Sequence, residues 1–213
     1  MDNIPQARPE MDQEMIEAAA LALQNERLVM GESVFKFEEA FARYTGVKRA
    51  VSISSGTDAL ILALLAVDCR GKEVVTTPFS FIATANTIVH AHGTPKFCDV
   101  RRNDYNIDAA LMPETITEKT RAIMPVHLFG HPCDMAEIYD LAADKGLMVV
   151  EDACQAHGSE YNGKKVGALG NMGCFSFYPT KNMTVGGDGG MVTTDDEDLA
   201  NLVAKLRDCG RTS

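Results

Sequence analysis

One lysine follows a short apolar segment, at a position where its amine could act as a nucleophile. Lys181 lies in the polar segment Tyr178–Asn182, directly after Cys174–Phe177, and the glycine-rich run Gly186–Gly190 comes soon after it. A lysine amine becomes a nucleophile in surroundings that favour its neutral form. Most lysines are solvated surface residues instead. Lys181 therefore indicates a function only if the fold places other suitable residues near it.

A second segment has the composition of an anion-binding turn. Ser54–Leu60 follows an apolar strand pattern and opens a helical one. Small residues let the backbone approach an anion, and the free N–H groups at a helix start point toward it. Phosphate fits this chemistry. The simpler alternative is an ordinary N-cap by Ser55 or Thr57.

A third segment, Val149–Gly158, places two carboxylates at the end of an apolar strand. Burying an unpaired carboxylate is costly, so we expect Glu151 and Asp152 to have a cationic partner or a metal. The alternative is an acidic helix start, which the helix dipole stabilises.

Together the three segments match the needs of one cofactor, pyridoxal phosphate. Its phosphate needs an anion cradle, and its aldehyde needs a lysine amine. Its ring nitrogen needs a carboxylate, which keeps that nitrogen protonated and able to draw electrons. Ligands of a parallel sheet bind beyond the carboxyl ends of the strands, which is where all three segments are expected.

The elements that must position these residues alternate along the chain. The predicted strands are Ala50–Ile53, Glu73–Thr76, Pro95–Asp99, Ala122–Pro125, Leu147–Glu151, Cys174–Phe177 and Gly190–Thr193. The predicted helices between them are Thr57–Val67, Ile82–His92, Met135–Lys145 and Asp196–Arg207. We also expect a short turn at Asp108–Met112 and a surface hairpin at Ser159–Ala168.

Two further helices are predicted in the first 48 residues. Apolar residues recur at helical spacing from Met11 to Leu23, and again from Ser33 until Gly46 ends the second helix. The loop Leu28–Gly31 separates them. The whole pattern predicts an α/β fold with a mostly parallel sheet covered by helices on both faces. We expect one domain over residues 1–213, with residues 1–48 as a helical segment leading into it.

Composition argues against several classes of protein. The 213 residues include 30 acidic and 20 basic ones, a formal charge of −10, and nucleic acid needs a basic patch. The longest apolar run, Ala59–Val67, is too short to span a membrane. Met1–Asp12 is polar and contains proline, so we expect no secretory leader. Six scattered cysteines without a CxxC pair favour a reduced, cytoplasmic compartment.

Two other ligand classes fit the sequence less well. His127 and His131 have the spacing of two metal ligands on a helix, but Gly130 and Pro132 predict a loop there. We therefore expect no metal, and His127 could instead line the pocket because it follows a strand. None of the glycine-rich stretches forms GxGxxG between a strand and a helix, which disfavours a nicotinamide oxidoreductase.

Five stretches of the chain match, in order, the motifs of one family. They are Ser54–Leu60, Thr77–Asn86, Pro125–Gly130, Glu151–Gly158 and Ser176–Asn182. The chain resembles the DegT/DnrJ/EryC1/StrS family of sugar-nucleotide aminotransferases, and the resemblance covers nearly the whole sequence. It implies fold type I of the pyridoxal-phosphate-dependent transferases, the aspartate-aminotransferase-like fold, and its large domain.

The resemblance implies a role for each matching residue. Lys181 would form the internal aldimine and then move a proton between substrate and cofactor. Asp152 would pair with the ring nitrogen, and Gln155 would bind the 3-hydroxyl. Phe81 would stack on the open ring face, although it could simply be a core aromatic of the following helix. The residues implied to hold the phosphate are Gly56, Thr57 and Ser176.

The resemblance also implies a reaction and partners. L-Glutamate would leave its amino group on the cofactor, which would pass it to a keto-sugar linked to a nucleoside diphosphate. Family members work as homodimers whose active sites are completed by the partner chain. Some relatives with a histidine in place of the lysine are sugar dehydratases, so Lys181 favours aminotransfer.

Family members continue into a smaller C-terminal domain, which we expect to be absent from this sequence. The last predicted helix is followed only by a short segment to Ser213 with no terminal cap, which is more typical of a cut than of a natural end. A truncated cofactor-binding domain acting as a scaffold, or half of a split enzyme, therefore stays open as an alternative. For nucleotide contact, the candidates are Arg101, Arg102 and the Leu28–Glu32 loop, chosen by their expected exposure.

Overall fold

The computed structural model describes residues 7–211, and the expectations for residues 1–6 and for Ser213 lie outside that range. Its helices are α1 (Gln13–Asn25), α2 (Glu32–Thr45), α3 (Gly56–Ala66), α4 (Ala83–His90), α5 (Met112–Thr115), α6 (Met135–Lys145) and α7 (Glu197–Arg207). Two short 3-10 turns, Ala109–Leu111 and Leu128–Gly130, accompany them.

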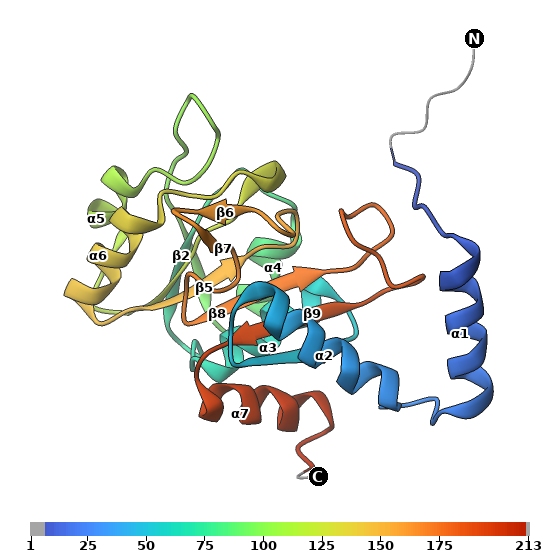
Figure 1. The fold of residues 1–213 in the computed structure, drawn as a ribbon. Helices are drawn as coiled ribbons and strands as arrows, with labels where there is room; N and C mark the ends of the chain where they lie inside the picture. Colours follow the sequence, from blue (N-terminus) through green and yellow to red (C-terminus); the bar gives the residue numbers. More distant parts are fainter. Residues whose placement is uncertain (1–6, 212–213) are drawn as a thin grey trace.

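Most strands belong to one seven-stranded sheet in the order β1-β9-β8-β5-β4-β2-β3 (Figure 1). These strands are β1 (Arg49–Ile53), β2 (Glu73–Thr76), β3 (Thr94–Phe97), β4 (Thr120–Met124), β5 (Met148–Asp152), β8 (Met172–Ser176) and β9 (Gly190–Thr194). β9 pairs antiparallel with both of its neighbours, and the other neighbouring strands pair parallel. The mostly parallel sheet predicted from the sequence is confirmed.

Every predicted strand is present, and the ends differ from the prediction by two residues at most. The helices agree as closely, and Gly46 ends α2 in a left-handed conformation with φ 85°, which glycine adopts without strain. The expected hairpin consists of β6 (Glu160–Tyr161) and β7 (Lys164–Lys165). The short turn expected at Asp108–Met112 continues into α5.

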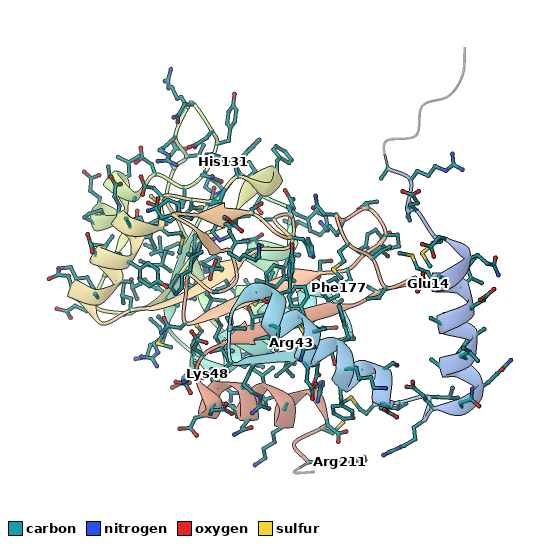
Figure 2. The ribbon with its side chains drawn as sticks, in the orientation of Figure 1. Glu14, Arg43, Lys48, His131, Phe177 and Arg211 are labelled. Carbon is teal, nitrogen blue, oxygen red and sulfur yellow. The ribbon has the colours of Figure 1, made fainter. Side chains whose placement is uncertain are left out.

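Helices cover both faces of the sheet, as expected for parallel strands. One buried cluster joins the sheet to α2, α5 and α6, and a second joins it to α3, α4 and α7. Phe177, labelled in Figure 2, lies just beyond β8. It packs in the first cluster against Phe37 and Phe41 of α2. The carboxyl edge of the sheet lies between these two layers of helices.

The predicted N-terminal helix exists but adds nothing to this core. α1 stands apart from the sheet, and none of its residues is buried (Figure 1). None of the helices within residues 7–211 is both long and apolar enough to cross a membrane.

Candidate active site

A cavity of about 510 Å³ opens at the carboxyl edge of the sheet. Its walls come from the ends of β5 and β8, the start of α3 and the loop before α4. The structure places all the site residues predicted from the sequence around it: Gly56, Thr57, Phe81, Asp152, Gln155, Ser176 and Lys181. Residues separated by more than 100 positions in the sequence thus share one small volume.

The start of α3 presents free N–H groups to this cavity. Ser55 is the N-cap, and its Oγ accepts the N–H of Asp58 at 3.0 Å. The N–H groups of Gly56 and Thr57 precede the first bond within the helix and are available to a ligand. Ser55 is therefore an N-cap, as the simpler alternative predicts, and the N–H groups of Gly56 and Thr57 remain without a partner within the helix.

Gly56 is needed where this turn meets β8. A Cβ on Gly56 would lie 2.5 Å from the Cβ of Ser176 and 3.0 Å from its Oγ. Real side chains do not approach so closely, so any other residue would force the two segments apart. The hydroxyl of Ser176 accepts the N–H of Tyr178 at 3.3 Å, which leaves its own proton free for an anion.

Asp152 ends β5 with its carboxylate buried beside the cavity, at 5% exposure. Thr84 Oγ1 donates to its Oδ2 at 2.8 Å, and the N–H of Cys154 donates to its Oδ1 at 3.3 Å. No ion pair within residues 7–211 involves this carboxylate. A buried carboxylate without a protein cation is costly unless a ligand supplies the positive charge.

Lys181 reaches the same cavity from the loop after β8. The side chain is half-buried, and its backbone N–H donates to the carbonyl of Tyr178 at 2.8 Å, which fixes the turn. Cys154 also lines the cavity, but burial and the neighbouring Asp152 raise the pKa of its thiol well above the usual value. The thiol therefore stays protonated and does not compete with the lysine amine as a nucleophile.

Gln155 is held in place by a strained turn. Its Oε1 accepts the N–H of Phe129 at 2.9 Å, and Phe129 has φ 52°, an uncommon conformation for a residue with a side chain. Because the oxygen is engaged, the amide nitrogen of Gln155 is the group left to donate to a ligand.

Phe81 is 64% exposed at the mouth of the cavity. The alternative that it is a core aromatic of the following helix is therefore wrong. Its position leaves a ring face free to cover a flat ligand.

His127 does not line this cavity, and that hypothesis is also wrong. The side chain is fully buried, with Nε2 2.9 Å from Oε2 of Glu151 and Nδ1 accepting the N–H of Cys133 at 3.1 Å. Both ring nitrogens are engaged, which leaves neither for a metal. Within the described residues no cluster of three metal-ligating side chains forms.

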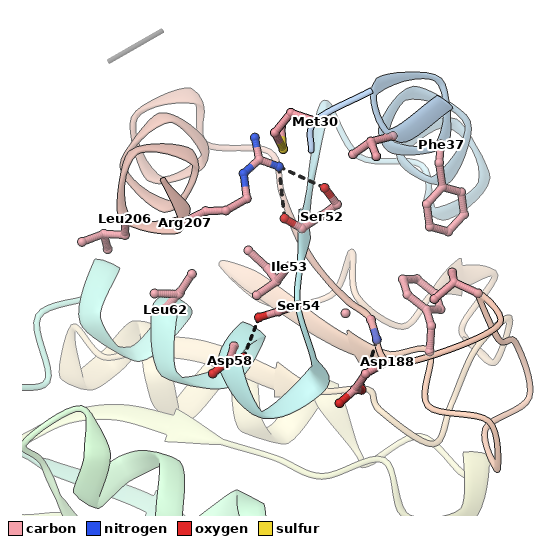
Figure 3. Close-up of a pocket in the computed structure, with 15 residues that line it drawn as sticks. Met30, Phe37, Ser52, Ile53, Ser54, Asp58, Leu62, Asp188, Leu206 and Arg207 are labelled. Carbon is pink, nitrogen blue, oxygen red and sulfur yellow. Dashed lines mark hydrogen bonds between the residues drawn. The ribbon is translucent and has the colours of Figure 1, made fainter. Parts of the chain in front are cut away.

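The structure also changes the expected nucleotide contacts. Arg101 is not a free surface cation, because its guanidinium is 2.6 Å from Oδ2 of Asp104. Arg102 is exposed. Met30, from the predicted loop, lines a neighbouring cavity of about 630 Å³ that shares Asp188 with the first one (Figure 3).

Comparison with known proteins agrees with this geometry. The profile of the DegT/DnrJ/EryC1/StrS aminotransferase family matches residues 9–213. The chain belongs to this family. Among curated relatives, the GDP-perosamine synthase of Caulobacter vibrioides is 44% identical over 182 residues, which cover 85% of this chain and 49% of the synthase. The chain spans about half the length of the curated relatives it matches.

Solved structures of the family have the same fold. The aminotransferase from Psychrobacter cryohalolentis matches with a TM-score of 0.92 and 40% identity, over 96% of this chain and 52% of that one. A GDP-4-keto-6-deoxymannose-3-dehydratase, solved with a trapped geminal diamine of pyridoxal phosphate and glutamate, matches with a TM-score of 0.92 and 31% identity. That match covers 98% of this chain and 55% of the dehydratase. The predicted aspartate-aminotransferase-like fold, fold type I, is confirmed.

Proposed function

We propose that this chain binds pyridoxal phosphate and carries out aminotransfer to a nucleotide-linked keto-sugar. The observation that carries the proposal is the composition of one cavity. A buried carboxylate without a protein cation, a lysine and the open N-terminus of α3 all line it. Each of these groups would bind a different chemical group of the same cofactor.

The residues present fit the cofactor's chemical groups. The N–H groups of Gly56 and Thr57 and the hydroxyl of Ser176 would hold the phosphate, in the cradle that a Cβ on Gly56 would fill. Asp152 would hold the proton on the ring nitrogen. When bound, pyridoxal phosphate supplies an electron sink for the negative charge that forms at the amino-bearing carbon.

The other residues orient the ring and move the proton. The amide nitrogen of Gln155 would donate to the oxygen on the ring, and Phe81 would cover the ring face and exclude water. The amine of Lys181 would bind the cofactor's aldehyde carbon and, once displaced by the substrate amine, take the proton from the amino-bearing carbon. It would pass this proton to the cofactor's aldehyde carbon, and in the second half of the reaction it would move a proton from that carbon to the sugar carbon that receives the amino group.

The relatives support the substrate classes. The curated relative from Caulobacter acts in the synthesis of an aminated nucleotide sugar, by its name, and the dehydratase structure holds glutamate on its cofactor. We propose L-glutamate as the amino donor and a keto-sugar of a nucleoside diphosphate as the acceptor. Lys181 favours aminotransfer over dehydration.

We further propose that residues 1–213 form the large, cofactor-binding domain of a cytoplasmic homodimer, with the C-terminal small domain outside this sequence. Exposed aromatic side chains support the dimer: Phe129, whose N–H bonds to Gln155, is 79% exposed, and Tyr105 is 52% exposed. All six cysteines are free, which fits a reduced compartment. Sedimentation of the chain at two concentrations tests the dimer.

The lysine assignment is tested by chemical trapping. The chain is mixed with pyridoxal phosphate and reduced with borohydride, which fixes a lysine-bound aldehyde as a stable amine, and the labelled peptide is then identified by mass. We expect the label on Lys181, no label in Lys181→Ala, and full label in Lys164→Ala, an exposed lysine outside the cavity. A label at another lysine, or none, contradicts the proposal.

A further inference from the structure

Two hydroxyl groups connect the mouth of the cavity to the buried carboxylate. Ser80 Oγ lies 2.7 Å from Thr84 Oγ1, which in turn donates to Oδ2 of Asp152 at 2.8 Å. Thr84 is 2% exposed, and all three residues line the cavity. Both residues lie in the stretch Thr77–Asn86 that resembles the family, but the sequence analysis gave neither of them a role.

The direction of these hydrogen bonds follows from chemistry. An ionised carboxylate only accepts, so the single proton of the Thr84 hydroxyl must point at Asp152. The oxygen of Thr84 can then only accept from Ser80. The result is a one-way chain of donors, from Ser80 through Thr84 to the carboxylate.

Thr84 is also rigidly placed. Its backbone N–H donates to the carbonyl of Phe81 at 3.0 Å, and its own carbonyl accepts the hydroxyl of Thr87 at 3.0 Å. One residue in the first turn of α4 thus contacts both the carboxylate and the segment that carries Phe81. These are the two groups that would hold the ring at its nitrogen and at its face.

We propose that Thr84, supported by Ser80, is a positioning residue that fixes the carboxylate of Asp152 for the ring nitrogen of pyridoxal phosphate. This inference rests on the function proposed above. A carboxylate that accepts two hydrogen bonds is held in one orientation, with lone pairs left for the ring N–H. Without the hydroxyl of Thr84, Oδ2 loses a partner in a buried site, and the carboxylate is free to rotate.

The test compares two ligands that differ at the ring nitrogen. Affinities of the full chain are measured by calorimetry for pyridoxal phosphate and for its carbocyclic analogue, in which a carbon replaces that nitrogen. Because the analogue has no N–H for Asp152, a role through Asp152 affects only the natural cofactor. General damage to the site affects both ligands.

The variants are chosen to distinguish the loss of the hydrogen bond of Thr84 from a change in the shape of its side chain. We expect Thr84→Val, which keeps the shape, to weaken pyridoxal phosphate binding roughly tenfold to hundredfold and to change analogue binding less than about threefold. Thr84→Ser should restore most of the affinity, and Ser80→Ala should cause an intermediate loss. Thr194→Val, the same change at an equally buried threonine of β9 that does not line the cavity, is the matched control and should bind as the unchanged chain does.

Each outcome decides. Equal loss of affinity for both ligands in Thr84→Val, the same loss in Thr194→Val, or no loss in Thr84→Val overturns the positioning role. If Thr84→Val fails to fold, Thr84→Ser and Ser80→Ala still separate the two explanations. An unchanged chain that does not bind pyridoxal phosphate at all overturns the proposed function and this inference with it.

Discussion

His127 and Glu151 form a fully buried pair, with 2.9 Å between Nε2 and Oε2, directly beside Asp152. Glu151 also accepts backbone N–H groups from Gly167, Leu169 and Gly170 at 2.6–2.8 Å. The backbone N–H of His127 donates to the carbonyl of Asp152 at 3.1 Å. The pair therefore holds the strand end that carries Asp152, without lining the cavity.

Glu151→Gln should lower the free energy of unfolding by about 2–4 kcal/mol. Its amide nitrogen would face a backbone N–H that needs an acceptor. Chemical denaturation measures the change. Glu160→Gln, which removes an exposed ion pair with Lys165, is the control and should cost less than about 1 kcal/mol. Equal losses of stability in the two variants would show that the buried network contributes no more to the free energy of unfolding than a surface ion pair does.

Gly56→Ala should weaken pyridoxal phosphate binding at least roughly tenfold and destabilise the fold by about 1–3 kcal/mol. The added Cβ would lie 2.5 Å from the Cβ of Ser176, so the cradle must open. The control is Gly187→Ala, where a Cβ meets no atom within 4 Å. A Gly56→Ala variant with unchanged affinity and stability would contradict the close packing of this turn.

Phe81→Ala should separate binding from stability. The side chain is 64% exposed, so its loss should change the free energy of unfolding by less than about 0.5 kcal/mol. Loss of the stacked ring should weaken cofactor binding roughly fivefold to tenfold. Phe177→Ala, a change at a residue with 1% exposure, should instead cost about 3–5 kcal/mol of stability. Normal cofactor affinity in Phe81→Ala would remove the stacking role.

His157 should make the fold sensitive to acid. Burial lowers the pKa of its ring from 6.5 to about 4, and both ring nitrogens are inaccessible and without a partner in the described structure. Between these pH values the unfolded chain binds a proton that the folded chain does not, so stability falls as the pH is lowered from about 6.5 to 4. The loss is about 3 kcal/mol.

The variant that checks this is His157→Gln, which does not titrate. Denaturation of both proteins across that pH range measures how the free energy of unfolding changes with pH. The slope should be smaller in the variant, because its unfolding takes up about one proton fewer. Parallel curves for the two proteins would show that His157 does not cause the acid sensitivity.

The arrangement of the sheet could be predicted because apolar strands and helical patterns alternate clearly along the chain. The two carboxylates at the end of β5 show the limit of that approach. Successive side chains on a strand point to opposite faces, so Glu151 and Asp152 must lie on opposite faces of the sheet. The sequence does not say which face holds the cavity, and only the family resemblance selected Asp152.

Contacts that depend on packing were not visible in the sequence. Thr84 is one of several threonines in a helical pattern, and nothing in its neighbours announces a bond to a residue 68 positions away. His127 follows a strand, as cavity residues do, but its side chain is buried against Glu151. In both cases the partner comes from a distant segment, so the contact could be identified only from the three-dimensional structure and not from spacing along the chain.

The most direct test of the proposed function is the response of the cofactor-loaded chain to L-glutamate. We predict that pyridoxal phosphate gives a visible absorption band, that L-glutamate removes this band, and that about one 2-oxoglutarate is released per bound cofactor. Asp152→Asn should slow this step at least roughly hundredfold, while Asp140→Asn, at an exposed carboxylate of α6 outside the cavity, should not. A band that forms but yields no 2-oxoglutarate with L-glutamate would contradict aminotransfer by this chain.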